Sequence, residues 1–222
     1  MAITELKNKI KHRVEEQLNW DDRVPESDIK IEVTDGVVRL SGEVPTYSSR
    51  LAAEEDALSV GGVYLVENDL NIKYPESFQV PNDNEIKSLL KNSLINDHRI
   101  HENEIKVNVF KGTVELDGIV SAFWHKDIIE KYAYHLPGVK DVVNNLKVKL
   151  TREFSDVEIT ADIKNAFMRN AIINSEQINV SVNNGIATLS GIAPNYSVKI
   201  TARDLAYFTA GIKNVTDNIV VK

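Results

Sequence analysis

Two histidines, His98 and His101, lie three residues apart and offer two imidazole nitrogens that could bind a metal ion. A zinc site needs three or four such ligands, and no further ligand accompanies this pair in the sequence. Arg99, between the two histidines, would repel a cation. The other three histidines of the chain form no cluster. We therefore interpret this segment as a surface loop and predict no metal site.

The sequence carries no pattern of a known catalytic centre. It has no Gly-x-Ser-x-Gly elbow and no His-Glu-x-x-His motif. It has no cysteine, which excludes thiolate nucleophiles, disulfides and cysteine metal sites. Its glycine-rich segments lack the Gly-Lys-Ser/Thr of a phosphate-binding loop. We predict that the protein is not an enzyme and that it has no catalytic residues and no cofactor.

One segment combines aromatic, aliphatic and basic residues at helical spacing. Trp124, Ile128 and Tyr132 follow one another at intervals of four residues, so they form one stripe on a helix, called here the Trp124 stripe. Tryptophan and tyrosine beside lysine suit the headgroup level of a membrane, where cations meet anionic lipid. The candidate membrane- or partner-binding residues are Trp124, His125, Lys126, Ile128, Lys131 and Tyr132.

A second interpretation of this stripe is structural. Aromatic-rich patches often pack against a neighbouring domain or a second chain. Asp127 and Glu130 dilute the positive charge of the segment, and the whole chain carries a formal net charge of -7. The sequence leaves both interpretations open.

The elements that must position these residues recur three times. The segment Asp35–Gly42 returns as Lys111–Gly118 and as Asn184–Gly191, at offsets of 76 and then 73 residues. Each copy places a residue and a glycine between two alternating runs, which is the pattern of a two-residue β-hairpin. We therefore predict a hairpin in each copy of an internal repeat.

Each repeat has the same predicted order of elements. In the first copy, apolar residues recur with helical period over 3–19 and alternate over 29–33, and a second helix spans about 47–60 before a third strand over 63–72. Tyr47, Phe123 and Tyr196 recur where this second helix begins, which indicates packing. The sequence thus predicts an α+β fold with three αββαβ domains, residues 1–75, 76–152 and 153–222, joined by short linkers.

Charge is unevenly distributed over the repeats. Residues 1–76 carry 9 basic and 16 acidic groups, residues 77–152 carry 11 and 10, and residues 153–222 carry 6 and 7. An acidic chain without a basic stripe binds nucleic acid poorly, so we predict no nucleic-acid partner. There is no apolar run of membrane-spanning length and no signal peptide at Met1. We expect a cytoplasmic protein as written, or a periplasmic one if the chain is a processed or cloned mature form.

The repeat resembles the BON domain, a family named after bacterial osmotically inducible and nodulation-related proteins. The resemblance rests on Gly-x-Val-x-Leu-x-Gly, then a helix ending in Gly-Val, and then Val-x-(Asn/Asp)-x-Leu-x-Val. In the first copy the matching residues are Gly36, Val38, Leu40, Gly42, Gly62-Val63 and Leu70. The second copy matches at Gly112, Val114, Leu116, Gly118, Gly138-Val139 and Leu146, and the third at Gly185, Ala187, Leu189, Gly191, Gly211-Ile212 and Ile219.

This resemblance implies an αββαβ fold and a non-catalytic module linked to phospholipid or membrane-surface binding, envelope integrity and osmotic stress. The shared motif is structural, so it assigns no catalytic residue. The leading functional hypothesis is a BON-type binding protein at a membrane surface. The alternative is a protein-interaction scaffold or chaperone-like module that binds a polypeptide through an exposed strand edge or the Trp124 stripe. The oligomeric state is not predicted.

Overall fold

The computed structural model describes residues 2–24, 29–100 and 105–221. His101, one of the two histidines considered as metal ligands, lies outside the described residues. Contacts group the chain into two compact units, one of residues 1–88, 109–114 and 133–142, and one of residues 89–108, 115–132 and 143–222. The boundary between these units runs through the second repeat.

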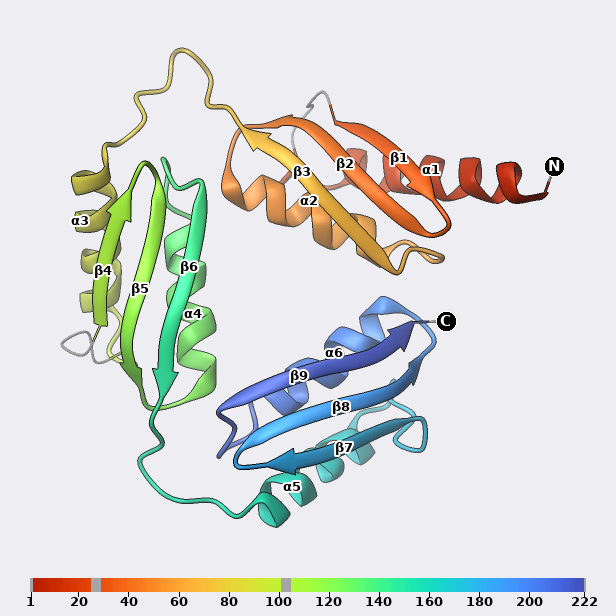
Figure 1. Cartoon of the computed structure of the whole chain (residues 1–222), viewed down its shortest axis with the longest axis vertical. Helices are drawn as coiled ribbons and strands as arrows, with labels where there is room; N and C mark the ends of the chain where they lie inside the picture. The colour runs from red at the N-terminus through yellow and green to blue at the C-terminus, as the bar shows by residue number, and fades with distance from the viewer. Residues whose placement is uncertain (1, 25–28, 101–104, 222) are drawn as a thin grey trace. The chain divides into compact units, whose positions relative to one another are not determined.

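The predicted αββαβ order is confirmed in all three repeats (Figure 1). The first repeat consists of α1 (Ala2–Trp20), β1 (Lys30–Thr34), β2 (Val37–Val44), α2 (Tyr47–Ser59) and β3 (Leu65–Ile72). The second consists of α3 (Asp83–Asn96), β4 (Ile105–Phe110), β5 (Thr113–Val120), α4 (Phe123–Tyr134) and β6 (Asp141–Val148). The third consists of α5 (Asp156–Arg169), β7 (Ile178–Asn183), β8 (Ile186–Ala193), α6 (Tyr196–Tyr207) and β9 (Asn214–Val221).

Each repeat has its own three-stranded sheet, in the order β1-β2-β3, β4-β5-β6 and β7-β8-β9. In the first and third sheets the hairpin strands pair antiparallel and the last strand pairs parallel to the central one. A parallel pair needs a crossover, and the second helix of the repeat provides it. In Figure 1 the two helices of each repeat lie on the same face of its sheet, and the other face is bare.

The hairpins turn through two residues, as the sequence predicts. Thr34 pairs with Val37, so only Asp35 and Gly36 lie in the loop. Both have positive φ, 49° and 80°, as a type I′ turn requires. The corresponding residues of the other repeats, Lys111-Gly112 and Asn184-Gly185, have the same signs.

The hairpin glycine also lies against the glycine that follows the second helix. A Cβ atom on Gly36 would lie 2.9 Å from the carbonyl oxygen of Gly62, and the Gly36 carbonyl accepts a hydrogen bond from the Tyr64 amide at 3.1 Å. The same approach joins Gly112 to Gly138 and Gly185 to Gly211. The repeated glycines therefore form a backbone-to-backbone junction, which explains why their spacing is constant.

The cores consist of the residues that the helical and strand periods select. Most of the predicted faces of the first helices are buried: Ile10, Val14 and Leu18; Ile86, Leu90 and Leu94; Ile159, Ile163 and Phe167. Leu6, which the helical period also places on this face of α1, is 60% exposed, because it lies near the end of a helix that extends beyond the sheet. The central strands contribute fully buried leucines, Leu40, Leu116 and Leu189. Each repeat therefore buries its apolar residues between its helices and its sheet.

Candidate functional site around helix α4

Helix α4 carries the predicted stripe on a half-buried face. Trp124, Ile128 and Tyr132 are each partly exposed, whereas Ile129, one position further round the helix, is fully buried. The stripe is therefore neither a bare surface nor part of the core. Its aromatic residues are held by contacts with the segment that follows α3.

Tyr132 is fixed by a buried carboxylate at the end of α3. Its hydroxyl donates a hydrogen bond to Oδ2 of Asp97 over 2.7 Å. Asp97 is only 7% exposed and also accepts two hydrogen bonds from the Arg99 guanidinium, from Nε at 2.8 Å and from a terminal nitrogen at 2.6 Å. These donors hold the pKa of Asp97 well below its ordinary value of 3.8. The carboxylate in turn raises the pKa of Tyr132.

Trp124 contacts the same arginine. The Arg99 guanidinium carbon lies 5.8 Å from the centre of the Trp124 ring, a cation–π distance. Arg99 thus pairs with Asp97 and also lies over the indole ring. The structure therefore brings Trp124 and Tyr132 together through Asp97 and Arg99, two residues that our sequence analysis assigned only to a loop.

The flanking basic residues have different surroundings. Lys131 is exposed and forms an ion pair with Asp127, one helical turn away, at 2.7 Å. The Lys126 ammonium lies 6.0 Å from the Phe123 ring centre. Lys131 is therefore on the solvent side of α4, whereas Lys126 is half-buried.

His125 is buried rather than exposed to a partner. Its Nδ1 lies 3.3 Å from the Ser121 hydroxyl, and its side chain lines a hollow of about 410 Å³ together with Ile119 and Leu150. Among the described residues that line this hollow there is no carboxylate. The geometry therefore separates His125 from the lysines with which the sequence grouped it.

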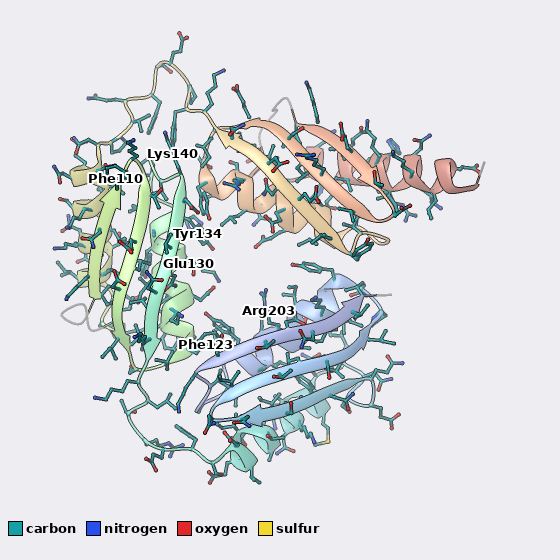
Figure 2. The ribbon with its side chains drawn as sticks, in the orientation of Figure 1. Phe110, Phe123, Glu130, Tyr134, Lys140 and Arg203 are labelled. Carbon is teal, nitrogen blue, oxygen red and sulfur yellow. The ribbon has the colours of Figure 1, made fainter. Side chains whose placement is uncertain are left out.

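The two ends of α4 contact residues of other repeats inside the two compact units. Phe123 packs against Tyr207 with ring centres 4.7 Å apart, and Tyr134 against Tyr47 at 5.9 Å. Figure 2 labels Phe123 and Tyr134 at the two ends of the helix. Tyr47, Phe123 and Tyr196 are all partly buried. These contacts involve the helix termini, whereas the stripe between them contacts its own repeat.

A signal for the Asp97–Arg99 contact does exist in the sequence. Asp21 and Arg23 stand 76 residues earlier, at the same offset that relates the other repeated residues. In both copies the aspartate accepts a hydrogen bond from the arginine amide two residues on, at 2.8 and 3.0 Å. A repeated Asp-x-Arg at the end of a helix thus marks a fixed turn.

Two features are absent from the described residues, a metal-ligand cluster and a membrane-spanning helix. Within residues 2–24, 29–100 and 105–221, no three histidine, aspartate or glutamate side chains are grouped so that they could hold a metal ion. In the same ranges, no helix has the length and apolar character needed to cross a bilayer.

The fold and site define a tandem array of three small αββαβ modules, the second of which has a distinctive helix. The family model of the BON domain matches residues 7–74, 82–149 and 155–222. The chain therefore belongs to the BON-domain family, as the repeated glycines predict.

A curated relative supports this assignment. Osmotically-inducible protein Y of Escherichia coli (strain K12) is 30% identical over 131 residues, which cover 58% of this chain and 65% of that protein. Among solved structures, the C-terminal domain of CdsD, a structural protein of the Type III secretion system of Chlamydia trachomatis, aligns over 95% of this chain and 96% of its own. Its sequence identity is 13% and its TM-score 0.27, too low to support any conclusion about this chain.

Proposed function

We propose that this protein is a non-enzymatic binding module that attaches to a phospholipid surface through helix α4 of its second repeat. The observation that carries this proposal is the contact between Arg99 and Trp124. It places a cation and an amphipathic ring side by side at the protein surface. An interfacial site needs this pair, because the indole lies at headgroup level while the guanidinium meets phosphate.

The balance of charge supports the second repeat as the one that binds. It carries 11 basic and 10 acidic groups, whereas the first repeat carries 9 and 16. The same helix carries two further cations, the exposed Lys131 and the half-buried Lys126. Because exposed charges interact over about 10 Å at ordinary salt, this local surface matters more than the net charge of the chain.

The two tryptophans of the chain allow a direct test. Trp20 lies in the first repeat and is 79% exposed, and Trp124 lies in α4. We expect the Trp20→Phe variant, in which Trp124 alone fluoresces, to show a blue-shifted emission with phosphatidylglycerol vesicles. We expect vesicles of brominated lipid to quench that emission, because the indole enters the interface.

The Trp124→Phe variant is the matched control, since it leaves only Trp20. It should bind the same vesicles with no shift in emission. A shift of Trp20 instead of Trp124 would assign binding to the first repeat. Failure of the wild-type protein to co-sediment with any anionic vesicle would contradict the proposal.

A polypeptide-binding scaffold is a second candidate, favoured by the bare sheet face of the third repeat. There β8 presents Ile186, Thr188, Ser190 and Ile192, and the flanking strands add only asparagine, serine, threonine and valine. In the first repeat, by contrast, Arg39 lies opposite Glu32 and Glu67 on the corresponding face. A surface without charges suits an uncharged extended chain.

This candidate has its own matched pair of variants. Ser190→Lys places a charge in the bare face of the third sheet, and Ser41→Lys does so at the corresponding position of the first. If an uncharged unfolded peptide binds the third sheet, the amide signals of that sheet alone should shift. Only the Ser190 variant should then lose binding. Equal binding by both variants would contradict the scaffold function.

A further inference from the structure

The first repeat buries two carboxyl groups at a position where the second repeat buries one. Asp21 follows α1 and is 9% exposed, and Asp56 lies on α2 and is 5% exposed. The offset of 76 residues maps Asp21 onto Asp97 and Asp56 onto Tyr132. The first repeat thus has an acid where the second has a phenol.

Asp21 already has the partners of an ionised carboxylate. Arg23 donates to it from Nε at 2.8 Å and from a terminal nitrogen at 2.6 Å, and the Arg23 amide donates at 2.8 Å. These donors lower the pKa of Asp21. Asp21 therefore keeps its negative charge in the folded protein.

Asp56 has fewer partners. Its Oδ1 accepts one hydrogen bond from the Gln17 side chain at 3.1 Å, and its Oδ2 is buried with no hydrogen-bond partner among the described residues. A buried carboxylate oxygen without a donor is costly, whereas a protonated one can itself donate. The unpaired atom therefore fits the neutral acid better than the anion.

The second repeat shows the arrangement that this position takes when a permanent donor is present. There the Tyr132 hydroxyl donates to the aspartate that corresponds to Asp21. Protonation of Asp56 would give the first repeat an O–H group that can donate to Asp21, as the Tyr132 hydroxyl donates to Asp97. The two repeats thus point to one requirement, an O–H donor from the second helix to the loop carboxylate.

The other charged groups around Asp56 do not replace this donor. From the α1 side, Gln17 is neutral and Asp21 is anionic, and Arg23 is engaged with Asp21 and with Glu55 of α2 at 3.4 Å. Burial, and then the Asp21 carboxylate, raise the pKa of Asp56 from 3.8 to about 6, against the opposing effects of Gln17 and Arg23.

We propose that Asp56 is a proton-binding site, at which one proton from solvent joins the carboxylate, faces Asp21 and fastens α2 to the end of α1. No other covalent bond changes when the proton binds or leaves. The first repeat is thereby more stable when the site is occupied, and its two helices separate more readily when the proton leaves.

The sign of the pH effect follows from the raised pKa. Between about pH 4 and pH 6 the folded first repeat holds a proton that the unfolded chain has released, so its stability falls as pH rises through this window. A pKa difference of about two units corresponds to about a 100-fold change in the unfolding equilibrium. Above that window the contribution is lost.

A carbon-13 NMR titration of the aspartate carboxyl groups in the full-length protein tests the site directly. We expect the Asp56 signal to titrate near pH 6. Asp22, which is exposed in the turn after α1, is the control position for the variants below. Titration of Asp56 near its ordinary value of 3.8 would overturn the proposal.

Urea unfolding followed by amide signals provides a second test, because each repeat reports its own transition. Between pH 4.5 and 7.5 the midpoint of the first repeat should fall and that of the third should stay nearly constant. Asp56→Asn should abolish the fall, and the control Asp22→Asn should keep it. An unchanged fall in Asp56→Asn would overturn the proposal, and if that variant does not fold, the carboxyl titration still decides.

Discussion

The first and second repeats join their two helices at the same place with different chemistry. In the second, a phenol on α4 donates to Asp97, and its raised pKa keeps that donor in place at any physiological pH. In the first, the donor position holds Asp56, which can donate only while protonated. The comparison teaches that one fold position can carry a permanent or a conditional hydrogen bond, depending on a single side chain.

The third repeat joins its two helices at this place without charged residues. The offset of 73 residues places Asn170, Ile172 and Leu205 at the positions of Asp97, Arg99 and Tyr132. Asn170 keeps the turn by accepting from the Ile172 amide at 3.1 Å, and Leu205 packs against the apolar core. This repeat is therefore the internal reference for both of the others.

The largest expected effect comes from removing the loop aspartate. Asp97→Ala should lower the free energy of unfolding of the second repeat by about 3 kcal/mol, because it leaves the Tyr132 hydroxyl and the Arg99 guanidinium without their shared acceptor. The matched Asp21→Ala should cost the first repeat clearly less at pH 7, since it also removes the charge that faces Asp56. Repeat-resolved urea unfolding measures both, and equal losses would contradict the comparison.

Acidification should change the stabilities of the first and second repeats in opposite directions. The pKa of Asp97 is lowered in the folded state, so its contribution is present above about pH 4 and is lost as pH falls below that value. The first repeat should instead gain stability as pH falls from 6 to 4. Unfolding midpoints of the two repeats, measured from pH 7 to pH 3, check this crossing.

The phenol itself should contribute less than the carboxylate. Tyr132→Phe removes only the hydroxyl and should lower the free energy of unfolding of the second repeat by about 1–2 kcal/mol. Tyr132→Asp should go further and give this repeat the pH dependence of the first. A Tyr132→Asp variant whose second repeat shows no new pH dependence between 4 and 7 would show that this position alone does not set the response.

The smallest effect concerns the start of the same helices. Thr46 and Asn195 cap α2 and α6 by accepting from the Ser49 and Val198 amides, whereas Ala122 precedes α4 without a side-chain acceptor. Ala122→Asn should therefore stabilise the second repeat by about 0.5–1 kcal/mol, and Thr46→Ala should destabilise the first by a similar amount. Thermal unfolding of the full chain compares the two.

The sequence was sufficient for the fold because its signals are local. The Asp35-Gly36 turn, the alternation over 29–33 and the helix-ending Gly62 each specify a backbone conformation at one place. The three copies then repeat the same information. Element order, hairpin geometry and the buried helix faces were therefore all predictable.

The candidate site was only partly predictable. Helical spacing placed Trp124 and Tyr132 on one stripe, but it could not show that Arg99 faces the indole or that Asp97 binds the phenol. Those contacts depend on where the loop after α3 lies against α4, which period and composition do not encode. The raised pKa of Asp56 likewise arises from burial that charge counting does not reveal.

The glycine junction has a consequence for how such chains can be recombined. The hairpin and the helix end of each repeat meet through backbone atoms, as at Gly36 and Gly62, so this contact uses groups that every copy of the repeat retains. A whole repeat can therefore be copied, exchanged or diversified while its internal geometry is retained. Genetic duplication of this unit would give each copy the same backbone contact and leave positions such as 56, 132 and 205 to vary independently.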